Sequence, residues 1–219
     1  MQVRTTTADT SYIRQLEQAT DPWSFVETLR GLRAAPSSEK WLVARDTRMP
    51  VLWLRGDGLT YAADTATVRA IRRGSIRLSR LTLRKPLERA PTTELRSGME
   101  LSWFAGYHAS GQLSPQLSAD VGYRVGRAPS FGLIRPLPSQ LRVAASLASA
   151  AANLSEIVAR AGVSAREAIR TLNALYACDL LGLAGPEDVA PIVAGVAEAR
   201  GGLTKLLHSV CKHLGRAAG

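Results

Sequence analysis

Two consecutive helices with clear ends are encoded between residues 154 and 176, and this stretch constrains the fold more than any other. The first helix ends at Gly162, a residue suited to the left-handed conformation in which helices terminate. Ser164 then begins the second helix as its N-cap, and Glu167 at the third helical position completes a capping box. Apolar residues at helical spacing mark one face of each helix, namely Leu154, Ile157, Val158 and Ala161 in the first and Ala168, Ile169, Leu172, Leu175 and Tyr176 in the second. The sequence therefore predicts a pair of helices joined by a tight turn.

The stretch from Leu141 to Leu183 resembles the winged-helix domains that end many bacterial regulators and signalling adaptors. It is similar in its short helix, its "AGVS" turn, its longer helix and its closing "LLGL" strand. In that family the longer helix often reads DNA. The resemblance implies three possible DNA contacts on the exposed face of this helix, which are Arg166, Arg170 and Asn173. The segment after Leu183 instead carries Glu187 and Asp188 where a basic wing would approach phosphate, which favours packing or protein contact.

The first half of the chain reads as a small α/β domain. We expect helices over residues 11–33, 65–73 and 98–110, and strands over 40–45, 50–64 and 75–85, with a hairpin turn at the "GDG" of residues 56–58. The fold class is therefore α+β, with a mostly antiparallel sheet. A Pro- and Gly-rich cluster from Gly126 to Pro138 suggests two domains, residues 1–135 and a winged-helix-like domain over 136–219. The latter ends in an amphipathic helix that could mediate a homodimer.

Positive charge is concentrated in the first half of the chain. The 219 residues carry a net charge of +10, and those from Gln140 onward hold eight basic and six acidic side chains, so most of the excess lies before them. The stretch "RRGSIRLSRLTLRK", residues 72–85, contains no acid. Its arginines, the candidate anion- or ligand-binding residues, are Arg72, Arg73, Arg77, Arg80 and Arg84. A bulge near Ser79 would gather the leucines on one face and turn Arg77, Arg80 and Arg84 outward.

Two interpretations of this basic stretch remain open. Arginines on an edge strand prevent pairing with other strands. Guanidinium groups also bind phosphate and carboxylate with paired hydrogen bonds, so the target could be a nucleic acid, a nucleotide second messenger such as cyclic di-GMP, or an acidic protein.

Signals for catalysis are weak. The chain has no phosphate-binding loop and no nucleophile elbow, and His108, His208 and His213 lack metal-ligand spacing. We therefore expect no catalytic residue, no metal and no cofactor. Two cysteines, Cys178 and Cys211, are too few for a disulfide framework, and no apolar run could span a membrane, so the sequence indicates a cytoplasmic protein.

These observations favour a non-enzymatic bacterial regulatory or signalling adaptor. Its partner would be an acidic protein or a nucleotide ligand, held by the arginine-rich strand. The alternatives are a DNA-binding transcriptional regulator that uses the helix at 165–177, and a receptor for cyclic di-GMP.

Overall fold

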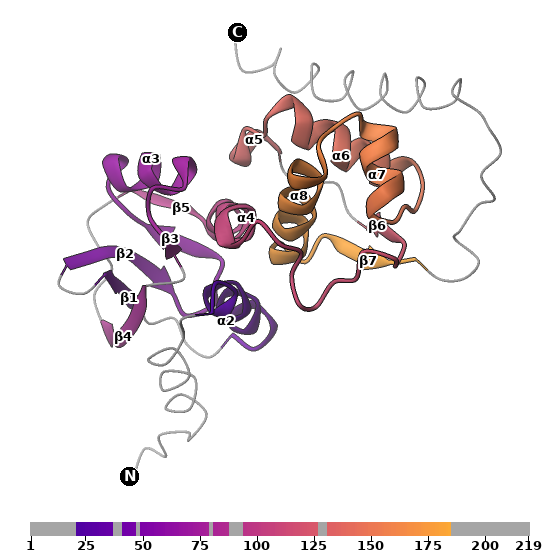
Figure 1. The fold of residues 1–219 in the computed structure, drawn as a ribbon. Helices are drawn as coiled ribbons and strands as arrows, with labels where there is room; N and C mark the ends of the chain where they lie inside the picture. The colour runs from indigo at the N-terminus through magenta and orange to yellow at the C-terminus, as the bar shows by residue number, and fades with distance from the viewer. Residues whose placement is uncertain are drawn as a thin grey trace, which may run out of the picture.

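The computed structural model describes residues 21–36, 41–46, 49–78, 81–87, 94–126 and 131–184, and over these the predicted α+β class is confirmed (Figure 1). The helices are α2 (Ser24–Ala34), α3 (Thr65–Arg73), α4 (Gly98–Ala109), α5 (Phe131–Ile134), α6 (Pro138–Ser149), α7 (Leu154–Ala161) and α8 (Ala165–Ala177). The strands are β1 (Trp41–Asp46), β2 (Met49–Arg55), β3 (Thr60–Ala62), β4 (Thr82–Leu87), β5 (Leu95–Ser97), β6 (Tyr123–Val125) and β7 (Leu181–Leu183). The predicted amphipathic helix at the end of the chain, and a homodimer through it, lie outside the described residues.

Five antiparallel strands form the main sheet, in the order β4-β1-β2-β3-β5. The predicted hairpin turn joins β2 to β3, so that Leu54 lies opposite Tyr61. Because side chains alternate between the faces of a strand, every second residue points to the same side. The face of the sheet that carries Ala44, Leu52, Leu54 and Tyr61 packs against helices α2, α3 and α4. Together they form a first core, which includes Phe25, Val26, Leu29, Ala44, Leu52, Leu54, Tyr61, Val68, Ile71, Leu101 and Ala105.

The strand predicted over residues 75–85 begins later than expected. Helix α3 ends at Gly74, whose backbone is in the left-handed conformation. The amide of Ser75 donates a hydrogen bond to the carbonyl of Ala70. The chain then runs irregularly and buries Leu78 and Leu81 in the first core, and the strand starts only at Thr82. The predicted bulge at Ser79 lies outside the described residues. Strand β4 is nevertheless at the edge of the sheet, as the edge-strand interpretation requires.

Helices α6, α7 and α8 enclose a second core with β6 and β7. Gly162 has φ 59° and ends α7, and the Ser164 hydroxyl accepts the amide of Glu167 at 3.2 Å, so both predicted helix ends are confirmed. The predicted capping box is not completed, because the Glu167 carboxylate accepts hydrogen bonds from Tyr107 and Ser139 instead. The second core includes Trp103, Tyr107, Tyr123, Val125, Val143, Leu147, Ile157, Ala168, Leu172 and Leu175. Strand β7 pairs with β6, which comes from upstream of α6, and Tyr123 also bridges to Ala152. The second core therefore draws on residues that precede the Pro- and Gly-rich cluster.

Helix α4 lies between the two cores (Figure 1). It gives Leu101 and Ala105 to the first core and Trp103 and Tyr107 to the second. At Gly106 the contact with α8 is so close that a Cβ atom would lie 2.4 Å from the carbonyl oxygen of Asn173. Only glycine allows the two backbones to approach in this way, so the packing of α4 on α8 depends on this position.

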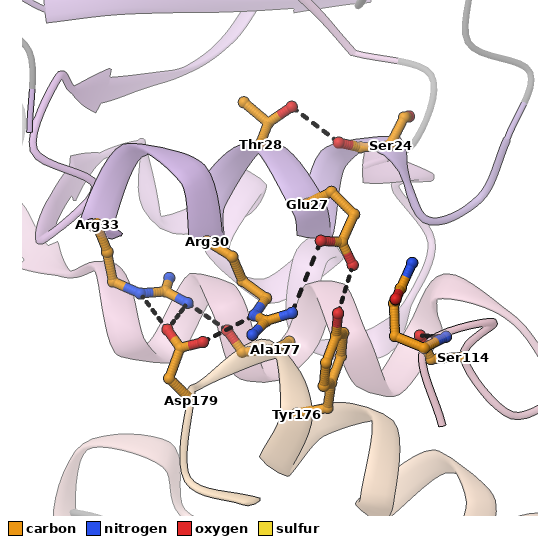
Figure 2. Close-up of polar contacts among 10 residues, drawn as sticks. Ser24, Glu27, Thr28, Arg30, Arg33, Ser114, Tyr176, Ala177 and Asp179 are labelled. Carbon is orange, nitrogen blue, oxygen red and sulfur yellow. Dashed lines mark hydrogen bonds and ion pairs between the residues drawn. The ribbon is translucent and has the colours of Figure 1, made fainter. Parts of the chain in front are cut away.

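A polar cluster also joins α2 to the end of α8, as Figure 2 shows. The Asp179 carboxylate accepts hydrogen bonds from Arg30 Nε at 2.7 Å and from Arg33 Nη2 at 2.8 Å. The guanidinium of Arg30 lies 3.9 Å from the centre of the Tyr176 ring, and the Tyr176 hydroxyl donates to Glu27 at 2.9 Å. Burial, and then the hydrogen bond to Glu27, raises the pKa of Tyr176 to about 12. These contacts hold the two parts of the chain together at the end of α8.

Candidate anion-binding surface

Helix α3 carries more basic residues than any other described helix or strand, and its own sequence defines both of its ends. Asp64 caps it, because its carboxylate accepts the amide of Thr67 at 2.7 Å and the Thr67 hydroxyl at 2.9 Å. These bonds, the amide bond first, lower the pKa of Asp64. Val68 and Ile71 face the first core, so the remaining positions of the helix are left to polar side chains.

The inner arginine of this helix is already used within the fold. Arg72 Nε donates to Glu100 Oε1 at 2.9 Å, and Glu100 is only 3% exposed. The other carboxylate oxygen accepts the hydroxyl of Tyr61 at 3.0 Å and lies 3.5 Å from Arg96 Nη1. Burial, followed by the neighbouring carboxylate, raises the pKa of Tyr61 above its ordinary value. Arg72, one of the predicted site residues, therefore balances a buried charge.

The outer arginines have no such role. Arg69, Arg73 and Arg77 are exposed, and none forms an ion pair with another described residue. We call these three residues the α3 arginine surface. Arg69 was missed by the sequence analysis, although its four-residue spacing from Arg73 places both on one face of the helix. This spacing is visible in the sequence, but the basic stretch was taken to begin at Arg72, which left Arg69 out.

The remaining arginines of the basic stretch are only partly placed. Arg84 lies in β4, opposite Val43 of β1. Its side chain, and the whole of Arg80, lie outside what the structure describes. Whether these two residues share a surface with Arg77 therefore stays a prediction.

The arginines predicted on α8 differ in their surroundings. Arg166 is exposed in the first turn, whereas Arg170 is half-buried with its guanidinium carbon 5.4 Å from the centre of the Tyr107 ring. The hydroxyl of Tyr107 in turn donates to Glu167 at 2.9 Å, and the hydroxyl of Ser139 donates to the same carboxylate. The start of α8 is thus held against α4 and α6 by polar contacts.

Asn173 does not lie on an exposed face, so the expectation that it faces outward with the two arginines is wrong. The residue is fully buried. Its side-chain oxygen accepts the amide of Ser114 at 3.0 Å, and its side-chain nitrogen donates to the carbonyl of Gln112 at 2.9 Å. Asn173 therefore holds the loop that follows α4.

The described residues contain few candidates for a metal site or for a reactive side chain. No three His, Cys, Asp or Glu side chains within the described ranges lie close enough to hold a metal ion. The thiol of Cys178 is buried, and this burial raises its pKa to about 12, so it stays protonated at neutral pH. His108 is held between α3 and α4, where its Nε2 lies 3.1 Å from the carbonyl oxygen of Arg72.

Comparisons with models of protein families, with curated proteins and with solved structures find no match to this chain. Within the described part of the chain, no helix combines the length and the apolar character that crossing a membrane requires.

Proposed function

We propose that this protein is a non-enzymatic bacterial regulatory or signalling adaptor that acts in the cytoplasm. It binds an acidic protein partner through the α3 arginine surface, Arg69, Arg73 and Arg77. The observation that carries the proposal is the contrast between Arg72, which a buried carboxylate neutralises, and its exposed neighbours, which no described acid neutralises.

The helix dipole alone is a weak reason for this cluster. Basic side chains near the C-terminus of a helix gain about 0.3–1 kcal/mol from the dipole, and the effect fades within the last turn. This accounts for Arg73, but Arg69 lies a turn earlier and Arg77 follows the end of the helix. Arg69 and Arg73, four residues apart on one helix, repel one another, and a carboxylate-bearing partner would relieve that repulsion.

Burial separates this proposal from the DNA alternative. Of the three residues proposed to contact DNA, Arg166 is exposed, Arg170 covers an aromatic ring and Asn173 is buried. A DNA regulator that uses this helix would therefore lack the asparagine and would depend on two arginines, one of them half-buried. The cyclic di-GMP alternative requires the same arginines as the acidic partner, so only a direct binding comparison distinguishes the two.

The test compares three probes in one anisotropy format: a labelled 12-residue oligoglutamate peptide, labelled cyclic di-GMP and a labelled 12-base-pair DNA duplex. Arg69→Glu with Arg73→Glu should weaken peptide binding about tenfold or more, since each exposed pair contributes up to about 1 kcal/mol and reversal adds repulsion. The matched control is Arg124→Glu with Arg160→Glu, which changes the net charge equally on β6 and α7. Equal loss in both variants would show a response to net charge only, and the proposal would fall. Tighter binding of cyclic di-GMP at these arginines would favour that alternative, and DNA binding that Arg166→Glu weakens would favour the DNA alternative.

A further inference from the structure

The arginines of α3 and α8 were predicted as separate sites for different ligands, yet the fold brings them to the same end of α4. Figure 1 shows α3 and α8 on either side of α4. His108, one residue from the end of α4, contacts the end of α3. Its ring nitrogen lies 3.1 Å from the carbonyl oxygen of Arg72, and its ring fills the space that a Cβ atom at Gly74 would need.

On its other side His108 meets the surroundings of Arg170. The rings of His108 and Tyr107 have centres 5.0 Å apart, and the Arg170 guanidinium covers the Tyr107 ring. The charge of Arg170 also acts on His108, whose pKa is lowered first by burial and then further by this arginine. An unbroken chain of contacts therefore leads from the end of α3, through the end of α4, to the start of α8.

The exposed charges lie along this chain of contacts. Each helical residue turns by about 100°, so Arg69 and Arg73 follow Arg72 around α3, starting from the side that faces α4 and leading outward. On α8, Arg166 lies four residues before Arg170 and shares its face, one turn nearer the helix start. Neither Arg166 nor Arg170 forms an ion pair with another described residue.

We propose that the α3 arginine surface continues across the end of α4 to Arg170 and Arg166, and that the combined surface binds an extended acidic segment of a partner polypeptide. The inference rests on the proposed function and adds the length, path and chemistry of the ligand. Packed helices lie about 8–10 Å apart, so the axes of α3 and α8 are separated by roughly 20 Å across α4. An extended peptide advances about 3.3 Å per residue and needs at least six or seven residues to span that distance.

Two features of the surface favour a polypeptide over a nucleic acid. Glu167 adds a half-exposed carboxylate beside Arg170, which evenly spaced phosphates would meet unfavourably, whereas a peptide can place a neutral residue there. Nucleic-acid strands are also commonly held by bases stacked on aromatic rings. Here the Tyr107 side chain is buried beneath Arg170, so its ring has no open face for a base, and the His108 ring already stacks on Phe104.

The test compares a 4-residue and a 12-residue oligoglutamate peptide, which extend over about 13 Å and about 40 Å. Arg166→Glu should weaken binding of the long peptide about fivefold, the upper range for one exposed pair, and should leave binding of the short peptide unchanged. Arg69→Glu with Arg73→Glu should weaken both peptides. Arg170→Lys keeps the charge on the same face but loses the planar guanidinium over the Tyr107 ring, so its affinity for the long peptide should lie between those of the native protein and Arg170→Gln.

The other possible results each contradict the extended surface, and one of them also contradicts the proposed function. If Arg69→Glu with Arg73→Glu weakens the long peptide and neither Arg166→Glu nor Arg170→Gln does, the extended surface is wrong and the proposed function stands. If none of these variants affects either peptide, both proposals are wrong. If a 12-nucleotide single-stranded DNA binds more tightly than the long peptide and loses affinity in Arg166→Glu, the ligand is a nucleic acid and the inference is overturned. Melting temperatures of all variants, compared with Arg124→Glu, show whether each protein is folded.

Discussion

Replacement of Glu100 by glutamine removes the charge that two arginines share inside the fold. The side chain keeps its shape, but Arg72 and Arg96 lose their common carboxylate. The Glu100 side chain is 4% exposed, that of Arg96 20% and that of Arg72 34%. Breaking a buried ion pair by removing one partner costs about 3–5 kcal/mol, and the partial exposure of Arg72 favours the lower end. At roughly 2–4 °C per kcal/mol for a chain of this size, the melting temperature should fall by about 6–12 °C.

Urea denaturation and thermal melting followed by circular dichroism measure this loss. The matched control is Glu156→Gln, because Glu156 is 24% exposed and lies 3.8 Å from Arg160, so its loss should cost less than about 1 kcal/mol. The free Arg72 adds positive charge beside the α3 arginine surface, so Glu100→Gln should bind the 12-residue oligoglutamate peptide at least as well as the native protein. If Glu100→Gln is no more destabilising than Glu156→Gln, the carboxylate does not stabilise the first core in the way argued.

Three further changes test packing, the α2–α8 contact and the buried thiol. Gly106→Ala should destabilise by about 2–3 kcal/mol in urea denaturation, because its Cβ would collide with the α8 backbone, while Gly111→Ala, with no atom within 4 Å, should be nearly neutral. Asp179→Asn keeps a residue that tolerates the observed φ of 55° but loses both arginine partners, so it should cost about 1 kcal/mol at low salt and less in 1 M NaCl. In a Cys211→Ala background, the thiol of Cys178 should react with a disulfide reagent only on unfolding. Because burial raises the pKa of Cys178 from 9.0 to about 12, its contribution to stability should be complete below pH 9 and lost as pH rises from 9 to 12, a decline that Cys178→Ala should reduce.

Elements with local end signals could be predicted from the sequence. Gly162 and Ser164 define their helix ends through their own backbone and hydroxyl, and the "GDG" turn requires only its own residues to form a hairpin. The helix over 65–73 has its predicted bounds in the structure, where Asp64 caps it and Gly74 ends it. Each of these features depends on contacts between residues a few positions apart in the chain, so the sequence alone is enough to predict it.

Features that depend on distant partners could not be predicted in the same way. The alternation after Gly74 is typical of a strand, but Leu78 and Leu81 are buried from irregular backbone because the first core lies beneath them. The pairing of β6 with β7 joins two three-residue strands separated by four helices, α5 to α8. The "LLGL" strand was expected, but its partner β6 is too short to be recognised alone. Asn173 looked exposed because the polar pattern of α8 does not reveal that α4 covers it.

The central position of α4 has a consequence for how the arginines could act together. The α3 arginine surface belongs to a helix of the first core, and Arg166 and Arg170 belong to a helix of the second. Their spacing is therefore set by the packing of each helix on α4, through Arg72 with Glu100 on one side and Gly106 on the other. A ligand that contacts both groups gains its full affinity only when both packings are kept, because a shift of one helix would separate the charges. A short ligand on α3 alone would not respond to such a shift, so an acidic segment that spans α4 would bind according to the relative positions of the two cores.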